Sequence, residues 1–124
     1  MKDEKQKIFL ELKSILSAYV PPLVVTKNEE KNYEISGNKK IKIQKREVNG
    51  IFFASTVIRK NYVSFYFFPI YTHREKFPDT PDDLMKLLKG KSCFHIKKFE
   101  DSTFEEIKAI LDKGLEIYKK EGWV

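Results

Sequence analysis

The chain has 124 residues, 41% of them hydrophobic and 14% aromatic, which predicts one folded domain and excludes a disordered chain, because disordered sequences are poor in aromatic residues. Cys93 is the single cysteine, which excludes an internal disulfide, and no apolar run approaches the roughly 20 residues that span a bilayer, so a soluble cytoplasmic protein is expected. The 24 basic and 18 acidic residues give a net charge of +6, which predicts either an anionic partner or a lysine-rich solvated surface.

The first predicted element is a helix over residues 3–19. Ile8, Leu12 and Ile15 recur at helical spacing and give it one apolar side. The proline pair at 21–22 ends the helix, since proline disrupts helical hydrogen bonding. We therefore expect this helix to pack one side against the rest of the domain.

From residue 23 the apolar residues alternate with polar ones, which is typical of strands with one solvated face. Strands are predicted at residues 23–27, 32–36 and 39–48. In the last of these, Ile41 and Ile43 alternate with lysines. Turns are predicted at residues 36–38 and at Asn49-Gly50, because Asn-Gly is a strong hairpin signal.

The two most apolar predicted strands cover residues 51–60 and 62–71. In the second of them, one face carries Val63, Phe65 and Phe67, and we expect that face to belong to the core. The other face carries Tyr62, Ser64, Tyr66 and Phe68. Because this second face is only half polar, it is expected either to be covered or to line a shallow site.

Two further helices are predicted from capping signals. Thr80 and Asp83 frame a capping box for a short helix that ends at Gly90, a residue suited to the left-handed conformation at helix ends. Ser102 and Glu105 frame a second capping box for a long C-terminal helix. Between the two helices, residues 91–98 are predicted to form a strand.

In the strand predicted at residues 91–98, Phe94 and Ile96 face one way and Cys93, His95 and Lys97 the other. Gly114 lies on the apolar side of the last helix and allows a close approach to a neighbouring element. Together the elements predict an α+β fold for a single domain, residues 1–124. Its antiparallel sheet has about five to six strands, with the N- and C-terminal helices packed on one face and one short helix before the last strand.

Gly90, Lys91 and Ser92 look like the end of a phosphate-binding loop of the form G-x-x-x-x-G-K-[ST]. The first glycine of that motif is missing, because Met85 stands in its place. A predicted helix also precedes the motif and a strand follows it, which is the reverse of the required order. The motif therefore predicts a turn between helix and strand instead of a nucleotide site.

Cys93 and His95 could approach one metal ion or act as a nucleophile and its base. Two ligands fall short of the three or four that zinc takes, and the other histidine, His73, lies in a separate turn-like segment. No third residue that would orient a catalytic pair is evident. We therefore predict no catalytic residue, no metal site and no cofactor, and favour a half-buried thiol beside a surface imidazole.

The candidate ligand site is the predicted sheet face opposite the helices, because that face mixes aromatic and polar groups. Its residues are Tyr62, Tyr66, Lys91, Cys93 and His95. These observations predict a small cytoplasmic non-catalytic binding or adaptor domain. Its expected partner is an unidentified small ligand or a protein, with no membrane, and the chain is expected to be a monomer or a weak dimer.

An alternative is nucleic-acid binding through a basic region of the sheet, with Tyr62 and Tyr66 as stacking surfaces. The basic region comprises Lys39, Lys40, Lys42, Lys45 and Arg46. It is not accompanied by a recognition-helix or RNA-binding signature, so the nucleic-acid hypothesis depends on charge and aromatic residues alone.

Three segments resemble the YdhG-like bacterial domains of unknown function: FASTVIRKNYVSFYFFPIY, LMKLLKGKSCFHIKKFED and the closing IYKKEGW. The similarity runs from about Ile51 to the end, and more loosely over the first helix. Its most specific motifs are R-K-N-Y-V-S-F-Y and G-K-S-C-F. The resemblance implies a compact α+β domain with its terminal helices against an antiparallel sheet.

One branch of that group is frataxin-like and acts as an intracellular iron chaperone for iron–sulfur cluster and haem assembly. The resemblance thus implies, as a further alternative, weak iron binding by carboxylates of the first helix and the neighbouring strand. In this chain the carboxylates of the first helix are Asp3, Glu4 and Glu11. They are interleaved with Lys2, Lys5, Lys7 and Lys13.

Overall fold

The computed structural model describes residues 3–43 and 45–124. Its helices are α1 (Glu4–Ser17), α2 (Pro69–Thr72), α3 (Asp82–Met85) and α4 (Asp101–Glu121), with a 3-10 turn, η1, at Arg74–Lys76. Its strands are β1 (Val24–Glu29), β2 (Asn32–Ser36), β3 (Lys40–Ile43), β4 (Arg46–Asn49), β5 (Phe52–Ile58), β6 (Val63–Phe67) and β7 (Cys93–Ile96). None of these helices is both long and apolar enough to cross a membrane.

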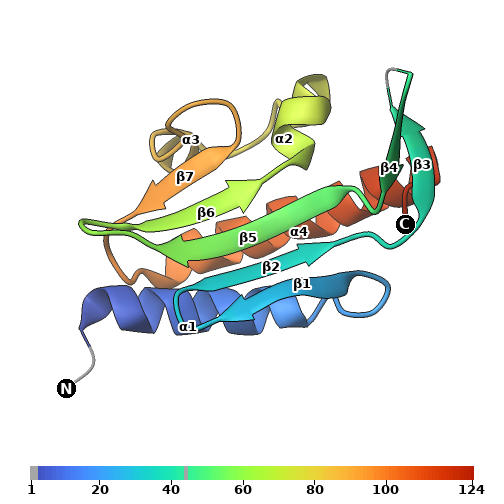
Figure 1. Ribbon diagram of the computed structural model, residues 1–124. Coiled ribbons are helices and arrows are strands. Elements are labelled where there is room, and N and C mark those ends of the chain that lie inside the picture. Colours follow the sequence, from blue (N-terminus) through green and yellow to red (C-terminus); the bar gives the residue numbers. More distant parts are fainter. Residues whose placement is uncertain (1–2, 44) are drawn as a thin grey trace.

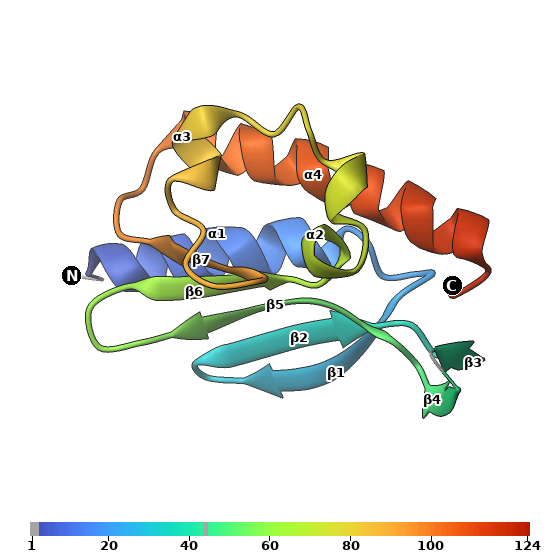
Figure 2. The same cartoon turned by 90° about the horizontal axis from the view of Figure 1, so that it is seen from above.

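Five strands form one antiparallel sheet in the order β1-β2-β5-β6-β7 (Figure 1). The terminal helices α1 and α4 lie on the same side of this sheet, and the short helices α2 and α3 lie beside α4 (Figure 2). The predicted α+β architecture is therefore confirmed. The opposite face of the sheet carries no helix in the described part of the chain.

The core fills the space between the sheet and the two terminal helices. Val63, Phe65 and Phe67 of β6 and Phe94 of β7 are each 0% exposed, so the predicted division of the strand faces is confirmed. The apolar side of α1 is buried as well, through Ile8, Phe9, Leu12, Ile15 and Leu16. Burying each large apolar side chain contributes about 1.5–3 kcal/mol to folding.

Helix α4 approaches the sheet closely at Gly114. A β-carbon at this position would lie 2.6 Å from Cζ of Phe67, so only glycine fits without a shift of the core. One turn further on, the buried Tyr118 hydroxyl donates a hydrogen bond of 2.8 Å to the carbonyl of Phe52. The predicted close approach at Gly114 is thus confirmed.

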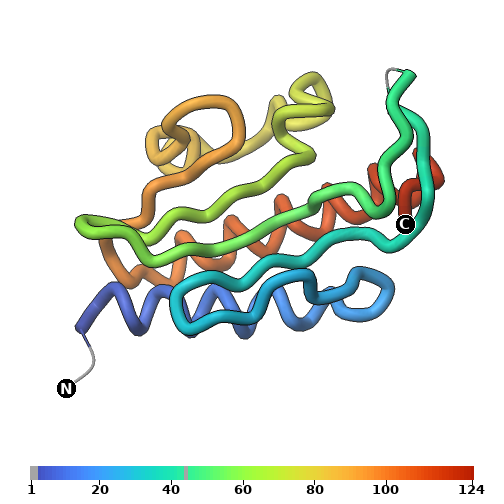
Figure 3. Tube along the Cα trace, viewed as in Figure 1, coloured from blue at the N-terminus to red at the C-terminus, as the bar shows by residue number. Residues whose placement is uncertain are grey.

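Residues 39–48 fold as a hairpin, so the single strand predicted there is wrong. Strand β3 pairs antiparallel with β4 in a separate two-stranded sheet that stands at one end of the main sheet (Figure 3). Lys45 reverses the chain with a φ of 70°, a left-handed conformation that non-glycine residues seldom adopt. Gln44 lies outside the described residues. Since neither position is glycine or proline, the turn carries no sequence signal.

The strand predicted at residues 62–71 ends earlier, at Phe67, and the following residues form α2. Pro69 explains the change, because it cannot donate to a strand ladder and its fixed φ suits the first position of a helix. The chain therefore leaves the sheet at this point and crosses to the side of α4.

Both predicted capping boxes are wrong. Helix α3 begins after Pro81, and the Thr80 hydroxyl instead donates to the carbonyl of Phe77 at 3.1 Å. Helix α4 begins after Glu100, and the Glu105 carboxylate accepts from Lys108 at 3.4 Å. Gly90 does adopt the left-handed conformation, with φ 96°, but it lies in the turn into β7, since α3 has already ended.

Candidate functional site

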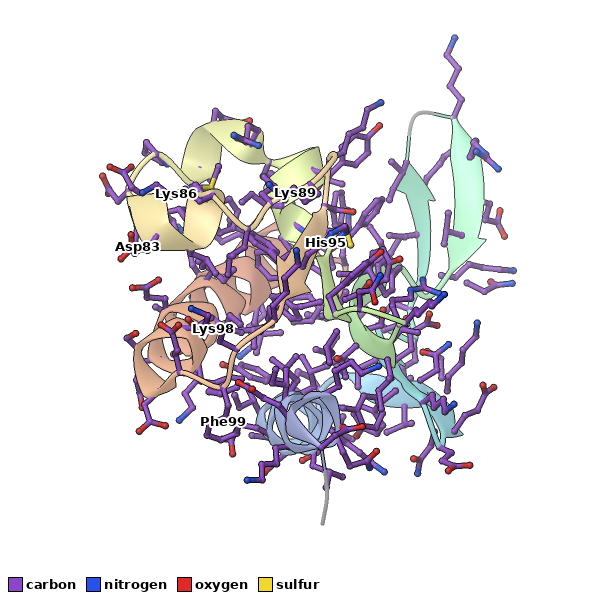
Figure 4. All side chains as sticks on the ribbon, turned by 90° about the vertical axis from the view of Figure 1, so that its left-hand side faces the viewer. Asp83, Lys86, Lys89, His95, Lys98 and Phe99 are labelled. Carbon is purple, nitrogen blue, oxygen red and sulfur yellow. The ribbon has the colours of Figure 1, made fainter. Side chains whose placement is uncertain are left out.

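A cavity of about 420 Å³ opens where α3, the end of β7 and the first turns of α4 meet (Figure 4). This volume lies within the range of small-molecule sites. Its basic side chains are Lys86, Lys89, Lys97 and Lys98, together with the imidazole of His95. Its acidic side chains are Asp83, Glu100 and Glu106, and the hydroxyls of Ser102 and Thr103 add neutral polar groups. The cavity can therefore offer hydrogen bonds to a polar ligand.

The chain between α3 and β7 builds one wall of the cavity by folding back along the outer edge of β7. The amide of His95 donates to the carbonyl of Leu87 at 2.9 Å, and the amide of Lys89 donates to the carbonyl of Cys93 at 2.7 Å. The positive φ of Gly90 allows this tight reversal. As a result, Lys89 and His95, which come from opposite arms of the turn, line the same cavity.

The charged groups of the cavity form no ion pairs with one another. Within residues 3–43 and 45–124, the ion pairs are Lys40–Glu47 and Lys108–Glu105, and His73 contacts Glu121 at 3.4 Å; all of these lie outside the cavity lining. The lysines that line the cavity thus have no carboxylate partner at ion-pair distance within the described residues. An anion that enters the cavity would supply the missing partner.

The imidazole of His95 is held in place by a neighbouring aromatic ring. The ring of Tyr62 stacks on it with centroids 3.9 Å apart and planes 15° from parallel. Burial lowers the pKa of His95 below its ordinary value, and the nearby charges of Lys89, Lys97 and Arg59 lower it further. The imidazole is therefore neutral at pH 7 and can both donate and accept a hydrogen bond.

A second perturbed group lies on the α4 wall. Burial raises the pKa of Glu106, and the negative charge of Asp83 raises it further. Both residues line the cavity, Asp83 from α3 and Glu106 from α4. The lining thus mixes both signs, with the carboxylates of Asp83, Glu100 and Glu106 among four lysines.

The five residues that the sequence predicted as a site do not all meet in this cavity. His95 lines it, and Tyr62 supports His95 by stacking. Tyr66 and Cys93 lie opposite each other in the β6–β7 register, on the sheet face away from the helices. Lys91 is directed elsewhere, with its ammonium 5.4 Å from the ring centroid of Tyr71.

Tyr66 also accepts a hydrogen bond from Arg59, a residue that the sequence did not place at the site. Nη2 of Arg59 donates to the hydroxyl of Tyr66 at 2.7 Å, and Nε of Arg59 donates to Oγ of Ser64 at 3.4 Å. The hydrogen bond to Tyr66 raises the pKa of Arg59. These contacts join the side chains of Arg59, Ser64 and Tyr66 on the sheet face opposite the helices.

The sequence placed Lys97 on the same face of the strand as His95, but it did not identify the lysines around the cavity as one group. The sequence feature that points to a basic site is the concentration of lysines on both sides of β7. These are Lys86, Lys89, Lys91, Lys97 and Lys98. Sequence spacing alone does not show which of them converge, because convergence depends on the fold-back along the edge of β7. Lys91 has the same charge and lies in the same stretch, yet it does not line the cavity.

The carboxylates that the iron-chaperone hypothesis invokes are partly used in local structure. Asp3 caps α1 by accepting from the amide of Gln6 at 2.8 Å, and Glu4 accepts from the amide of Phe99 at 2.8 Å. A group of three or more histidine, cysteine or acidic side chains that could hold a metal ion does not occur among the described residues.

Comparison with known proteins gives no relative for this chain: no family model matches it, and neither a curated protein nor a solved structure is significantly similar. The fold and the cavity therefore define the molecule only as an α+β domain with a charged site at one edge of its sheet.

Proposed function

We propose that this protein is a small non-catalytic binding domain that holds a small anionic ligand in the cavity between α3, β7 and α4. The observation that carries the proposal is the set of cavity lysines that form no ion pair within the described part of the chain. A phosphorylated or carboxylated molecule is the class of ligand that such a lining recognises, because ammonium groups form charge-assisted hydrogen bonds with phosphate and carboxylate oxygens.

The shape of the site favours a small ligand over a macromolecule. The volume of about 420 Å³ accommodates a compact metabolite, and the groups that line it converge from three separate segments. Each ammonium contact at such a partly exposed site contributes about 0.2–1 kcal/mol. Several contacts are therefore needed, and Lys89, Lys97 and Lys98 can supply them together with the hydroxyls of Ser102 and Thr103.

The arrangement favours binding over catalysis. The thiol of Cys93 does not line the cavity with His95, so a nucleophile and a base do not meet there. The imidazole of His95 is stacked on Tyr62 and surrounded by cations. These features suit a hydrogen-bonding and positioning role for His95.

The experiment is an isothermal titration of the full chain with inorganic phosphate and with sulfate, repeated for the variant Lys89→Gln/Lys97→Gln. We expect saturable binding to the wild type and at least a fivefold loss of affinity in the variant, the order of magnitude that follows from losing two partly exposed ionic contacts. The matched control is Lys27→Gln/Lys42→Gln, which removes the same charge from β1 and β3 and should bind as the wild type does. Equal losses in both variants, or no binding to the wild type, would overturn the proposal.

Two alternatives from the sequence remain hypotheses with their own tests. Nucleic-acid binding through the β3–β4 hairpin predicts retention on an oligonucleotide column and an affinity that falls steeply with salt; no retention at low salt would remove it. Iron binding predicts broadening of resonances near Asp3, Glu4 and Glu11 on titration with ferrous iron, and an unchanged spectrum at millimolar iron would remove that hypothesis.

A further inference from the structure

The lining of the cavity mixes charges of both signs at close spacing. Lys86 lies one turn from Asp83, and Glu100 lines the cavity beside Lys97 and Lys98. An anion without other polar groups would therefore meet carboxylates as well as ammonium groups. A hydroxyl group can donate to a carboxylate and accept from an ammonium group. A ligand that carries hydroxyls beside its anionic group thus matches this lining better than a simple anion does.

The exposed and the less exposed parts of the lining carry different polar groups. The four lysines are exposed, and so are the carboxylates of Asp83 and Glu100. The side chains that are half-buried or buried are those of Leu87, His95, Ile96, Thr103 and Glu106. Among the described lining residues, Glu106 is therefore the one carboxylate that is half-buried, and it lies with apolar side chains and neutral polar groups.

The carboxylate of Glu106 has no partner within residues 3–43 and 45–124, since it forms no ion pair and accepts no hydrogen bond there. Thr103 and Glu106 are three residues apart on α4, so they are neighbours on the side of the helix that lines the cavity. Partial burial makes an unpartnered carboxylate costly, and hydrogen-bond donors reduce that cost. Its two oxygens can accept from two adjacent hydroxyls of one ligand.

We propose that the ligand is a phosphorylated polyol, such as glycerol phosphate or a sugar phosphate, whose phosphate binds the exposed lysines and whose adjacent hydroxyls donate to the carboxylate of Glu106. This inference rests on the proposed function, because it names the class of anion that the same cavity holds. The volume of about 420 Å³ accommodates such a molecule, and Leu87 and Ile96 can contact its carbon skeleton. Glu106 then serves as a specificity element, since it disfavours anions that have no donor to offer.

The test compares two pairs of phosphate esters by isothermal titration of the full chain. Glycerol 3-phosphate is paired with n-propyl phosphate, and glucose 6-phosphate with cyclohexylmethyl phosphate. The members of each pair share the phosphate and a skeleton of similar size and differ in the hydroxyls. In at least one pair, we expect the polyol phosphate to bind about fivefold to twentyfold more tightly, the preference that two hydrogen bonds to a partly exposed carboxylate supply.

The variant Glu106→Gln locates this preference. Removal of the negative charge alone would tighten both members of a pair equally, so the ratio of their affinities reports the hydroxyl contact. We expect the ratio to fall at least threefold in Glu106→Gln, while the alkyl phosphate binds as tightly as before or more tightly. Glu105→Gln is the matched control and should keep the wild-type ratio, because Glu105 does not line the cavity and pairs with Lys108.

The outcomes separate this inference from the proposed function. Ratios near one in the wild type, a ratio that persists in Glu106→Gln, or an equal fall in Glu105→Gln overturns the polyol and leaves the anion site intact. Binding of inorganic phosphate without binding of any of the four esters has the same meaning. Failure of inorganic phosphate and of all four esters to bind overturns the proposed function as well.

Discussion

The helix-covered face of the sheet and the cavity at its β7 edge are built from opposite chemistry. The first buries aromatic rings such as Phe65 and Phe94 completely between the sheet and the helices. The second gathers ammonium and carboxylate groups, such as Lys89 and Glu106, that find no ion-pair partner in the described chain. The comparison predicts that stability resides in the first region and the proposed ligand binding in the second, so substitutions should affect one without the other.

The largest expected effect is on the helix-covered face. Phe65→Ala should lower the free energy of unfolding by about 3–5 kcal/mol, because it leaves a cavity in a fully packed layer. Urea denaturation followed by circular dichroism measures the change. The exposed Lys42 on β3 is the control, and Lys42→Ala should stay within about 0.5 kcal/mol. Comparable midpoints for the two variants would mean that the faces of the sheet are assigned wrongly.

A second variant tests how closely α4 packs on this face. Gly114→Ala should lower the free energy of unfolding by about 1–3 kcal/mol, because the new methyl group meets the rigid ring of Phe67. Alanine is otherwise the better helix former by about 1 kcal/mol, so a stabilised variant would show that the helix does not press on the sheet at this point. Thermal unfolding provides the measurement, with the exposed Lys113→Ala in the same helix as control.

Substitutions at the cavity are expected to weaken anion binding and to leave stability almost unchanged. Lys89→Gln/Lys97→Gln should weaken phosphate binding at least fivefold and leave the free energy of unfolding within about 0.5 kcal/mol of the wild type. Both quantities can be measured on one preparation, by titration calorimetry and by urea denaturation. A large loss of stability in this variant would contradict the separation of the two regions.

The smallest expected effect concerns pH. Since the pKa of His95 is lowered in the folded chain, the stability that its neutral form contributes is present above its ordinary pKa and is lost as the pH falls through the folded pKa. Sulfate, which keeps its charge in this range, should bind more tightly over the same interval, because protonated His95 joins Lys89 and Lys97 as a cation.

Nuclear magnetic resonance titration of the imidazole checks this expectation: sulfate should raise the pKa of His95. The variant His95→Gln should bind sulfate with little dependence on pH between about 5 and 7, the interval in which histidine ordinarily titrates. An unchanged pKa of His95 in saturating sulfate would place the anion away from the imidazole.

The sequence predicted the helix-covered face well, because alternation such as Val63, Phe65 and Phe67 reports directly which side of a strand is buried. It predicted the hairpin at Lys45 poorly, since a left-handed lysine gives no local signal. The capping boxes failed because Thr80 and Glu105 bind other partners in the folded chain.

The candidate site was only partly predictable, for a physical reason. The alternation in β7 placed Cys93 and His95 on one face, and the structure pairs them with Tyr66 and Ser64 of β6. The cavity, however, is assembled by hydrogen bonds between β7 and the segment just before it, together with α4 from further along the chain. Convergence of this kind is a tertiary property that neither periodicity nor composition reports.

The most direct test of the anion site is a backbone amide titration of the full chain with sulfate, followed residue by residue by nuclear magnetic resonance. The account predicts saturable shifts confined to the cavity segments, residues 86–89, 95–98 and 101–106, with one common affinity. Shifts of equal size along the lysine-rich hairpin at residues 39–49, or shifts that never saturate, would show that sulfate follows the overall positive charge and that the cavity is not a binding site.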